Sequence, residues 1–223
     1  MKSRLFPRTV IGTVILLWVT IPAKAGPPLI CHAIAIGQAK SLPQVGWNRE
    51  GKGGYDLKNL TRDTLAILNS NTPVLVRMET LRRATLYARQ DPQVAKELLT
   101  RLHMRAADGE AAGHPEAMAW FDLGYLAETY QQWMGRSEPN PARGLDGYAY
   151  VKRAISLRGS DPEMEFAATL ITLSGPESDH REHLQKALAG AKNDPLLAQN
   201  LSSTFTGQAM SVMPREHPLA AQP

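Results

Sequence analysis

Apolar residues recur with a helical period along most of the chain from residue 57 onward. The first stripe contains Leu57, Leu60, Leu65 and Leu68, which fall on one face of a helix. Stripes of the same period occupy residues 74–88, 94–102, 117–130, 148–157, 164–173, 184–191 and 197–205. The pattern predicts eight helices and an all-α fold.

Several of these stripes begin with the same local chemistry, a short oxygen-bearing side chain followed by proline. The pairs are Thr72-Pro73, Asp91-Pro92, Asp161-Pro162 and Asp194-Pro195. Such a side chain accepts a hydrogen bond from a free N–H of the first turn, and proline fits the first helical position because its missing donor is not needed there. We therefore interpret these aspartates as helix boundaries and not as active-site acids.

The boundaries also recur at a fixed distance from a basic-alanine pair. Ala84, Ala154 and Ala187 each follow Arg or Lys and each precede a capping aspartate by the same offset. The last two copies are 33 residues apart and the first two 70, close to twice that period. This spacing predicts antiparallel helical hairpins stacked as a short α-solenoid over residues 56–206.

The segment Trp120-Phe121-Asp122-Leu123-Gly124 matches the W-x-x-L-G opening of a tetratricopeptide repeat. Residues 56–206 therefore resemble the tetratricopeptide-like (TPR/Sel1-like) helical-repeat superfamily. The whole chain, including ICH, AKSLP, VRMETLRRA, AWFDLGY and DPEMEFA, is similar to a group of uncharacterised secreted bacterial proteins. The first resemblance implies an α-solenoid, and neither implies an activity.

Residues 1–25 have the features of a secretory signal peptide. A basic flank precedes the apolar run 10–21, and Ala23-Lys24-Ala25 is a small-x-small cleavage site, so we expect cleavage near Ala25-Gly26 and a secreted, periplasmic protein. This leader holds four of the 25 basic residues and no acid, which leaves 21 basic against 21 acidic residues. Because the mature chain is neutral, we expect no nucleic-acid partner. No second long apolar stretch follows the leader, so we expect no membrane-spanning segment after cleavage.

The regions that flank the helical stripes have different compositions. Residues 26–55 form an N-terminal segment and a glycine-rich loop, in which Pro27 and Pro28 can open a short helix. We expect this segment to cap the first hairpin. Residues 207–223 contain few apolar side chains and are predicted to be disordered.

Cys31 is the only cysteine, and His32 follows it directly. Neighbouring side chains diverge by about 100° in a helix and point to opposite faces of a strand, so His32 is poorly placed to activate the thiol. We therefore expect a packed thiol. An intermolecular disulfide, or catalysis with a histidine brought near by folding, is the alternative.

Two histidines, His180 and His183, lie one helical turn apart and form a candidate metal site that needs a third ligand. His180 also aligns with Leu184 and Ala187, which favours a half-buried packing role. Glu163 and Glu165 follow a capping aspartate, where negative charge is stabilised by the helix dipole.

The charged set Arg77, Glu79, Arg82 and Arg83 predicts ion pairs on one helix, either solvated or between helices, with an anion-binding groove as the alternative. Aromatic residues at 120, 125 and 130 are spaced for core packing, and they could also line a ligand groove. A candidate binding surface made from both groups contains Arg77, Arg82, Trp120, Tyr125 and Tyr130.

The sequence thus favours a secreted helical-repeat protein that binds another protein without catalysis and without a cofactor. One alternative is a small thiol- or metal-dependent hydrolase that uses Cys31 and a histidine. The other is a structural subunit of an envelope assembly.

Overall fold

A computed structural model of the chain describes residues 28–44, 54–134 and 139–205. The predicted signal peptide, most of the glycine-rich loop and the predicted disordered tail lie outside these ranges. The described residues form helices and no strand, which confirms the all-α fold. Each of the eight apolar stripes lies on a helix, and one short helix precedes them.

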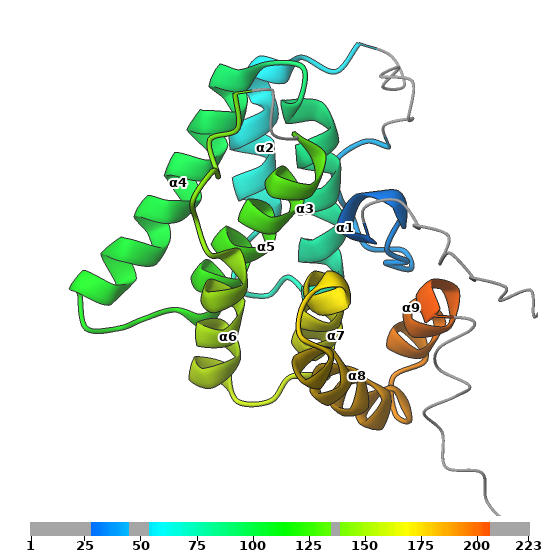
Figure 1. Cartoon of the computed structure of the whole chain (residues 1–223). Coiled ribbons are helices and arrows are strands. Elements are labelled where there is room, and N and C mark those ends of the chain that lie inside the picture. Colours follow the sequence, from blue (N-terminus) through cyan, green and yellow to red (C-terminus); the bar gives the residue numbers. More distant parts are fainter. Residues whose placement is uncertain (1–27, 45–53, 135–138, 206–223) are drawn as a thin grey trace, which may run out of the picture.

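Most of the helices from η1 onward are joined by short connections, and the longer connections are residues 32–56 between α1 and η1 and residues 134–146 between α5 and α6 (Figure 1). Their bounds are α1 Pro28–Cys31, η1 Leu57–Asn59, α2 Leu60–Ile67, α3 Val74–Ala88, α4 Pro92–Ala111, α5 Ala117–Trp133, α6 Gly147–Arg158, α7 Pro162–Ile171, η2 Thr172–Ser174, α8 Glu177–Ala191 and α9 Pro195–Phe205.

Three of the four predicted helix starts have the expected cap. Asp91, Asp161 and Asp194 each accept hydrogen bonds from the backbone N–H groups two and three residues ahead. The fourth prediction was wrong, because the Thr72 hydroxyl donates instead to the Ile67 carbonyl and α3 begins without a side-chain cap. Thr72 therefore closes the turn after α2.

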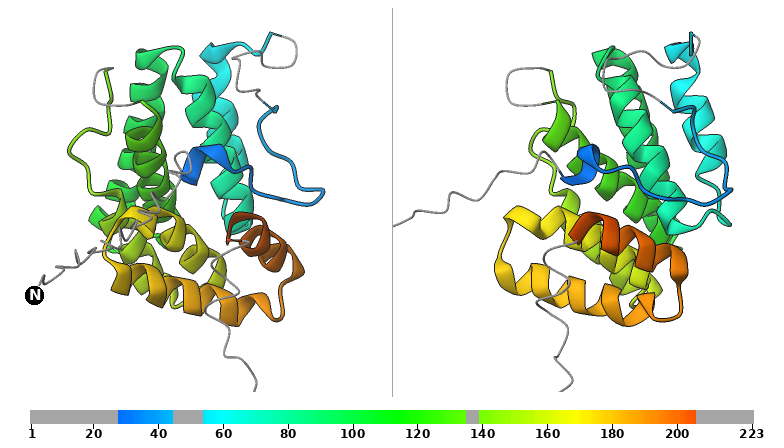
Figure 2. Two further views of the ribbon diagram at one scale, coloured as in Figure 1. Left: turned by 45° about the vertical axis from the view of Figure 1, so that its right-hand side comes forward. Right: turned by 90° about the vertical axis from the view of Figure 1, so that its right-hand side faces the viewer.

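Helix α5 lies at the centre of the molecule and touches α1, α3, α4, α6 and α7. In Figure 2, the C-terminal helices α7, α8 and α9 lie below the upright helices, and α7 contacts α3 and α5. The core fills the space between these two groups and includes the fully buried Phe121, Tyr125, Tyr130 and Phe166. The most extensive contacts join α5 to α6 and α7 to α8.

Glycines permit the closest approach within both of these helix pairs. A Cβ added to Gly124 on α5 would lie 2.6 Å from the carbonyl oxygen of Gly147 at the start of α6. A Cβ on Gly190 of α8 would collide with the ring of Pro162 at the start of α7. The glycine that carried the repeat-like motif is therefore a packing residue, because no side chain fits between α5 and α6.

The N-terminal segment packs on α3, as predicted for a cap on the first hairpin. It also extends to α5 and α9. Helix α1 ends at Cys31, and residues 33–44 continue without helical structure between the two helix groups (Figure 2). The Leu29 N–H donates to Gln132 on α5, and the Ala35 N–H donates to Asn200 on α9. The segment thus joins helices that are far apart in the sequence.

The contact between Gly124 and Gly147 generates a stability prediction. We expect Gly124→Ala to lower the free energy of unfolding by about 1–3 kcal/mol, because the added methyl must push α5 and α6 apart. Lys96→Ala on the exposed face of α4 is the control and should leave the value nearly unchanged. Urea unfolding followed by circular dichroism measures both. Equal stability of the two variants would contradict the packing argument.

Candidate functional site

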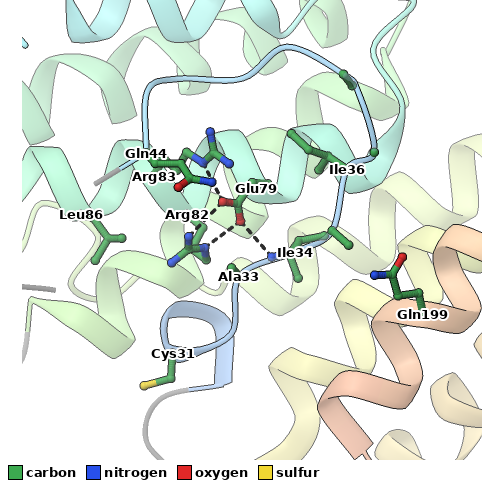
Figure 3. Close-up of a pocket in the computed structure, with 13 residues that line it drawn as sticks. Cys31, Ala33, Ile34, Ile36, Gln44, Glu79, Arg82, Arg83, Leu86 and Gln199 are labelled. Atoms are coloured by element: carbon green, nitrogen blue, oxygen red, sulfur yellow. Dashed lines mark hydrogen bonds and ion pairs between the residues drawn. The ribbon is translucent and has the colours of Figure 1, made fainter. Parts of the chain in front are cut away.

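A hollow lies above the charged residues of α3, where residues 31–44 loop over that helix (Figure 3). Its floor is formed by Glu79, Arg82 and Arg83, and the segment runs around them as a rim. Gln44 and Gln199 lie on opposite sides of the rim. The hollow has a volume of about 690 Å³.

Glu79 is the centre of the floor, and its side chain is 1% exposed. Its two carboxylate oxygens accept hydrogen bonds from the Ile34 N–H at 3.0 Å, from Arg82 at 2.7 and 2.9 Å and from Arg83 at 2.6 Å. Burial raises the pKa of Glu79, but the arginines and the Ile34 N–H outweigh it and hold that pKa below its ordinary value. The carboxylate is therefore ionised at neutral pH.

Both arginines also hold the backbone of the N-terminal segment. Arg82 donates to the Ile30 carbonyl at 3.1 Å, and Arg83 donates to the Leu42 carbonyl at 2.5 Å. Together these bonds fasten the two ends of the loop to α3. The rim is thus positioned by the same three side chains that form the floor.

The opposite edge of the segment is held by α9. The Asn200 side chain accepts from the Ala35 N–H at 2.7 Å and donates to the Ala35 carbonyl at 3.0 Å, as a neighbouring strand would. Ile34 faces α3 and Ala35 faces α9, because successive residues of an extended chain point their N–H groups to opposite sides. No local pattern could indicate this role for Asn200, because it lies 165 residues from its partner.

Cys31 lines the hollow, and the structure does not bring it together with a histidine. Among the described residues, no hydrogen bond joins its thiol to His32 or to any other imidazole. Burial raises the pKa of the thiol above its ordinary value, although the Arg82 charge acts in the opposite direction. The thiol is therefore protonated at neutral pH, which disfavours the nucleophile of the hydrolase alternative.

His180 and His183 contact different residues. His180 contacts the Thr169 carbonyl through Nδ1 at 3.1 Å, whereas His183 contacts Glu165 through Nδ1 at 2.5 Å. Within the described ranges, no group of three or more His, Cys, Asp or Glu side chains is placed to hold a metal ion. His180 is half-buried and packs against the Phe205 ring, as predicted, and His183 is buried as well.

Sequence reasoning missed a hydrogen-bonded chain that connects α6, α7 and α8. The Tyr148 hydroxyl lies 2.8 Å from Nε2 of His183, whose other nitrogen contacts the fully buried Glu165. Ser160 donates to the second oxygen of Glu165 at 3.0 Å. Glu165 is thus an acceptor between helices and not only a charge in the first turn of α7. The i, i+3 spacing of two histidines gave no signal for this pairing.

The Tyr148 hydroxyl is protonated at neutral pH. Burial and the neighbouring Asp179 carboxylate raise the pKa of its hydroxyl above the ordinary value. A protonated phenol donates and accepts hydrogen bonds and does not attack a substrate. The arrangement therefore fixes the relative positions of the three helices.

The predicted binding surface lies mostly inside the molecule. Arg77, Tyr125 and Tyr130 are fully buried, and Arg82 is 7% exposed. Trp120 is half-buried, where it packs on Tyr150 and under the guanidinium of Arg153. These residues cannot together contact a partner, because the helices that carry them bury the same faces against each other.

A different surface is open along α4. A groove of about 750 Å³ lies between α2 and α4, and a second hollow of about 450 Å³ lies on the other side of the same α4 face. Met104 borders both hollows and is 47% exposed, more than any other large apolar side chain in the described ranges. Sequence periodicity did not identify it, since single exposed methionines are common on helices.

No known protein family, curated protein sequence or solved structure matches this chain. The tetratricopeptide-like assignment therefore remains a prediction, and the all-helical fold is what the structure establishes. In the described part of the chain, every helix is too short or too polar to cross a membrane.

The raised thiol pKa can be measured directly. We expect the rate of Cys31 alkylation by iodoacetamide to keep rising with pH beyond about 8.5, the ordinary pKa of a cysteine thiol, because only the thiolate reacts. The urea-unfolded protein is the control and should titrate at the ordinary value. A rate that levels off below about pH 8 in the native protein would show an activated thiol and restore the hydrolase alternative.

The buried contact between Glu165 and His183 should contribute more to stability than the exposed pair of Glu182 and Lys186 on α8. We expect Glu165→Gln to lower the free energy of unfolding by about 2–3 kcal/mol, because a charged hydrogen bond inside the protein is lost. Glu182→Gln removes an exposed partner of Lys186 and should have no measurable effect. Urea unfolding of the two variants at neutral pH tests this, and similar losses in both would refute it.

Proposed function

We propose that this chain is a non-catalytic protein-binding module that acts outside the cytoplasm. The observation that carries the proposal is the groove along α4, where the most exposed apolar side chain of the described residues stands between two hollows. Exposed methionine is a favourable contact residue because its flexible thioether adapts to a partner's shape. The extracellular location rests on the leader at residues 1–25.

The groove favours an amphipathic helix as the part of the partner that binds. Positions 97, 101, 104, 105 and 108 form one stripe on α4, and this stripe is about 16 Å long at 1.5 Å per residue. Leu65 and Met104 supply apolar contacts between charged residues of both signs. A helix with one apolar stripe between flanking charges matches this lining.

The repeat-like features support the same class of function. Ala84, Ala154 and Ala187 are all fully buried, and the aspartate that follows each of them caps the next helix. This recurrence is what stacked helical hairpins require, and such proteins bind partners through the surfaces of their helices. The proposed module is accordingly tetratricopeptide-like in construction.

Site-specific photo-crosslinking in the native cells tests the proposal. A benzophenone side chain at position 104 should capture one protein, and the same group at position 157 should not. Leu157 on α6 is the matched control, because it is the other exposed large apolar residue of the described ranges. The purified partner should then bind Met104→Asp at least about tenfold more weakly than Leu157→Asp. The same adducts at both positions, or none at position 104, would refute the proposal.

A further inference from the structure

The hollow above α3 carries an unbalanced positive charge. Of the charged side chains that line it, Arg82 and Arg83 are cationic and Glu79 is anionic, so the lining has a net charge of one positive unit. The side chains of the two arginines are only 9% and 11% exposed. A guanidinium stays protonated under all physiological conditions, so the charge cannot be removed by losing a proton.

The Glu79 carboxylate on the floor has no free site left to accept further hydrogen bonds from the arginines. Glu79 accepts four hydrogen bonds, which is about the number that two carboxylate oxygens can take. Arg82 spends three of its five N–H donors on Glu79 and Ile30, and Arg83 spends two of five on Glu79 and Leu42. Five guanidinium N–H donors of these two arginines are therefore not used by Glu79 or by the backbone of the segment.

The rigidity of these donors suits them to a ligand. Each guanidinium is fixed by bonds to Glu79 and to the backbone, so little side-chain entropy is lost when a ligand binds. The planar fork of arginine matches the spacing of two oxygens on one carboxylate or phosphate group. Apolar side chains of Ile36 and Leu86 also line the hollow and can contact the body of an organic acid.

We propose that this hollow binds a small oxyanion-bearing ligand, an organic carboxylate or a phosphate, through Arg82 and Arg83. The volume of about 690 Å³ lies within the range of small-molecule sites. Both sources share the oxyanion, and the contact with Ile36 and Leu86 favours the carboxylate with an apolar body. The proposal does not rest on the protein-binding function, which concerns the groove between α2 and α4.

Calorimetric titration of the full chain with hexanoate, hexanamide and inorganic phosphate tests the site. We expect hexanoate to bind once per chain, with a dissociation constant of about 1 mM or tighter, and uncharged hexanamide not to bind. If phosphate binds equally well, the oxyanion alone is recognised. If it does not, the ligand is an organic carboxylate. Either result supports the proposal, whereas binding of neither anion overturns it.

Variants of Arg83 test whether hexanoate binds in the hollow. Arg83→Gln should weaken hexanoate binding at least about tenfold, since three free donors and the excess charge are lost. Arg181→Gln removes an exposed arginine of α8 and should change nothing. Arg83→Lys keeps the charge without the fork and should also bind more weakly, and it decides the question if circular dichroism shows that Arg83→Gln is unfolded. Unchanged affinity in a folded Arg83 variant overturns the proposal.

Discussion

The ion pair between Arg77 on α3 and Asp122 on α5 is the interaction on which the arrangement of the helices depends. Both side chains are 0% exposed, and their nearest nitrogen and oxygen are 2.5 Å apart. Removing two charges from water is costly, so such a pair persists only where its remaining donors also find partners. Arg77 meets this requirement, because it donates to the Thr72 carbonyl at 3.0 Å and also to the Asn69 carbonyl. One side chain thus fixes α5, α3 and the turn after α2.

The cost of this burial is visible at Asp122. Burial raises the pKa of its carboxyl to about 6, even though the Arg77 charge lowers it. The carboxylate remains mainly ionised at neutral pH, and one of its oxygens has no hydrogen-bond partner among the described residues. The pair therefore sets the register between α3 and α5 at the expense of stability, whereas the surrounding apolar side chains supply the net stabilisation.

Helix α3 carries buried charge on two faces. Arg77 and Glu79 are separated by about 200° around the helix axis, so the first contacts α5 and the second contacts the N-terminal segment. Of the 15 residues of α3, only Arg83 is not buried. Because α3 is covered on all sides, its charges act between elements of the fold, and only the hollow beside Arg82 and Arg83 remains open to a small ligand.

The two open surfaces of the molecule differ in chemistry because the helices that carry them are covered to different extents. The hollow over α3 is closed in by the chain itself and is suited to something small and anionic. The groove along α4 lies on a helix that packs mainly on one side, against α5, and its outer face is free. A large partner can reach this face without displacing any of the residues that the structure describes. The two proposed functions therefore need not compete.

The eight apolar helices and three of their caps could be predicted from the sequence, since these depend on periodicity and on interactions within a few residues. The sequence also identified Arg77, Glu79, Arg82 and Arg83 as ion-pairing residues. Tertiary structure alone decided which of them were buried, that Asn200 would hold Ala35, and that Glu165 would pair with His183. These contacts join residues far apart in the chain, and no local pattern records which helix faces will meet. Met104 became notable only when the fold left it uncovered.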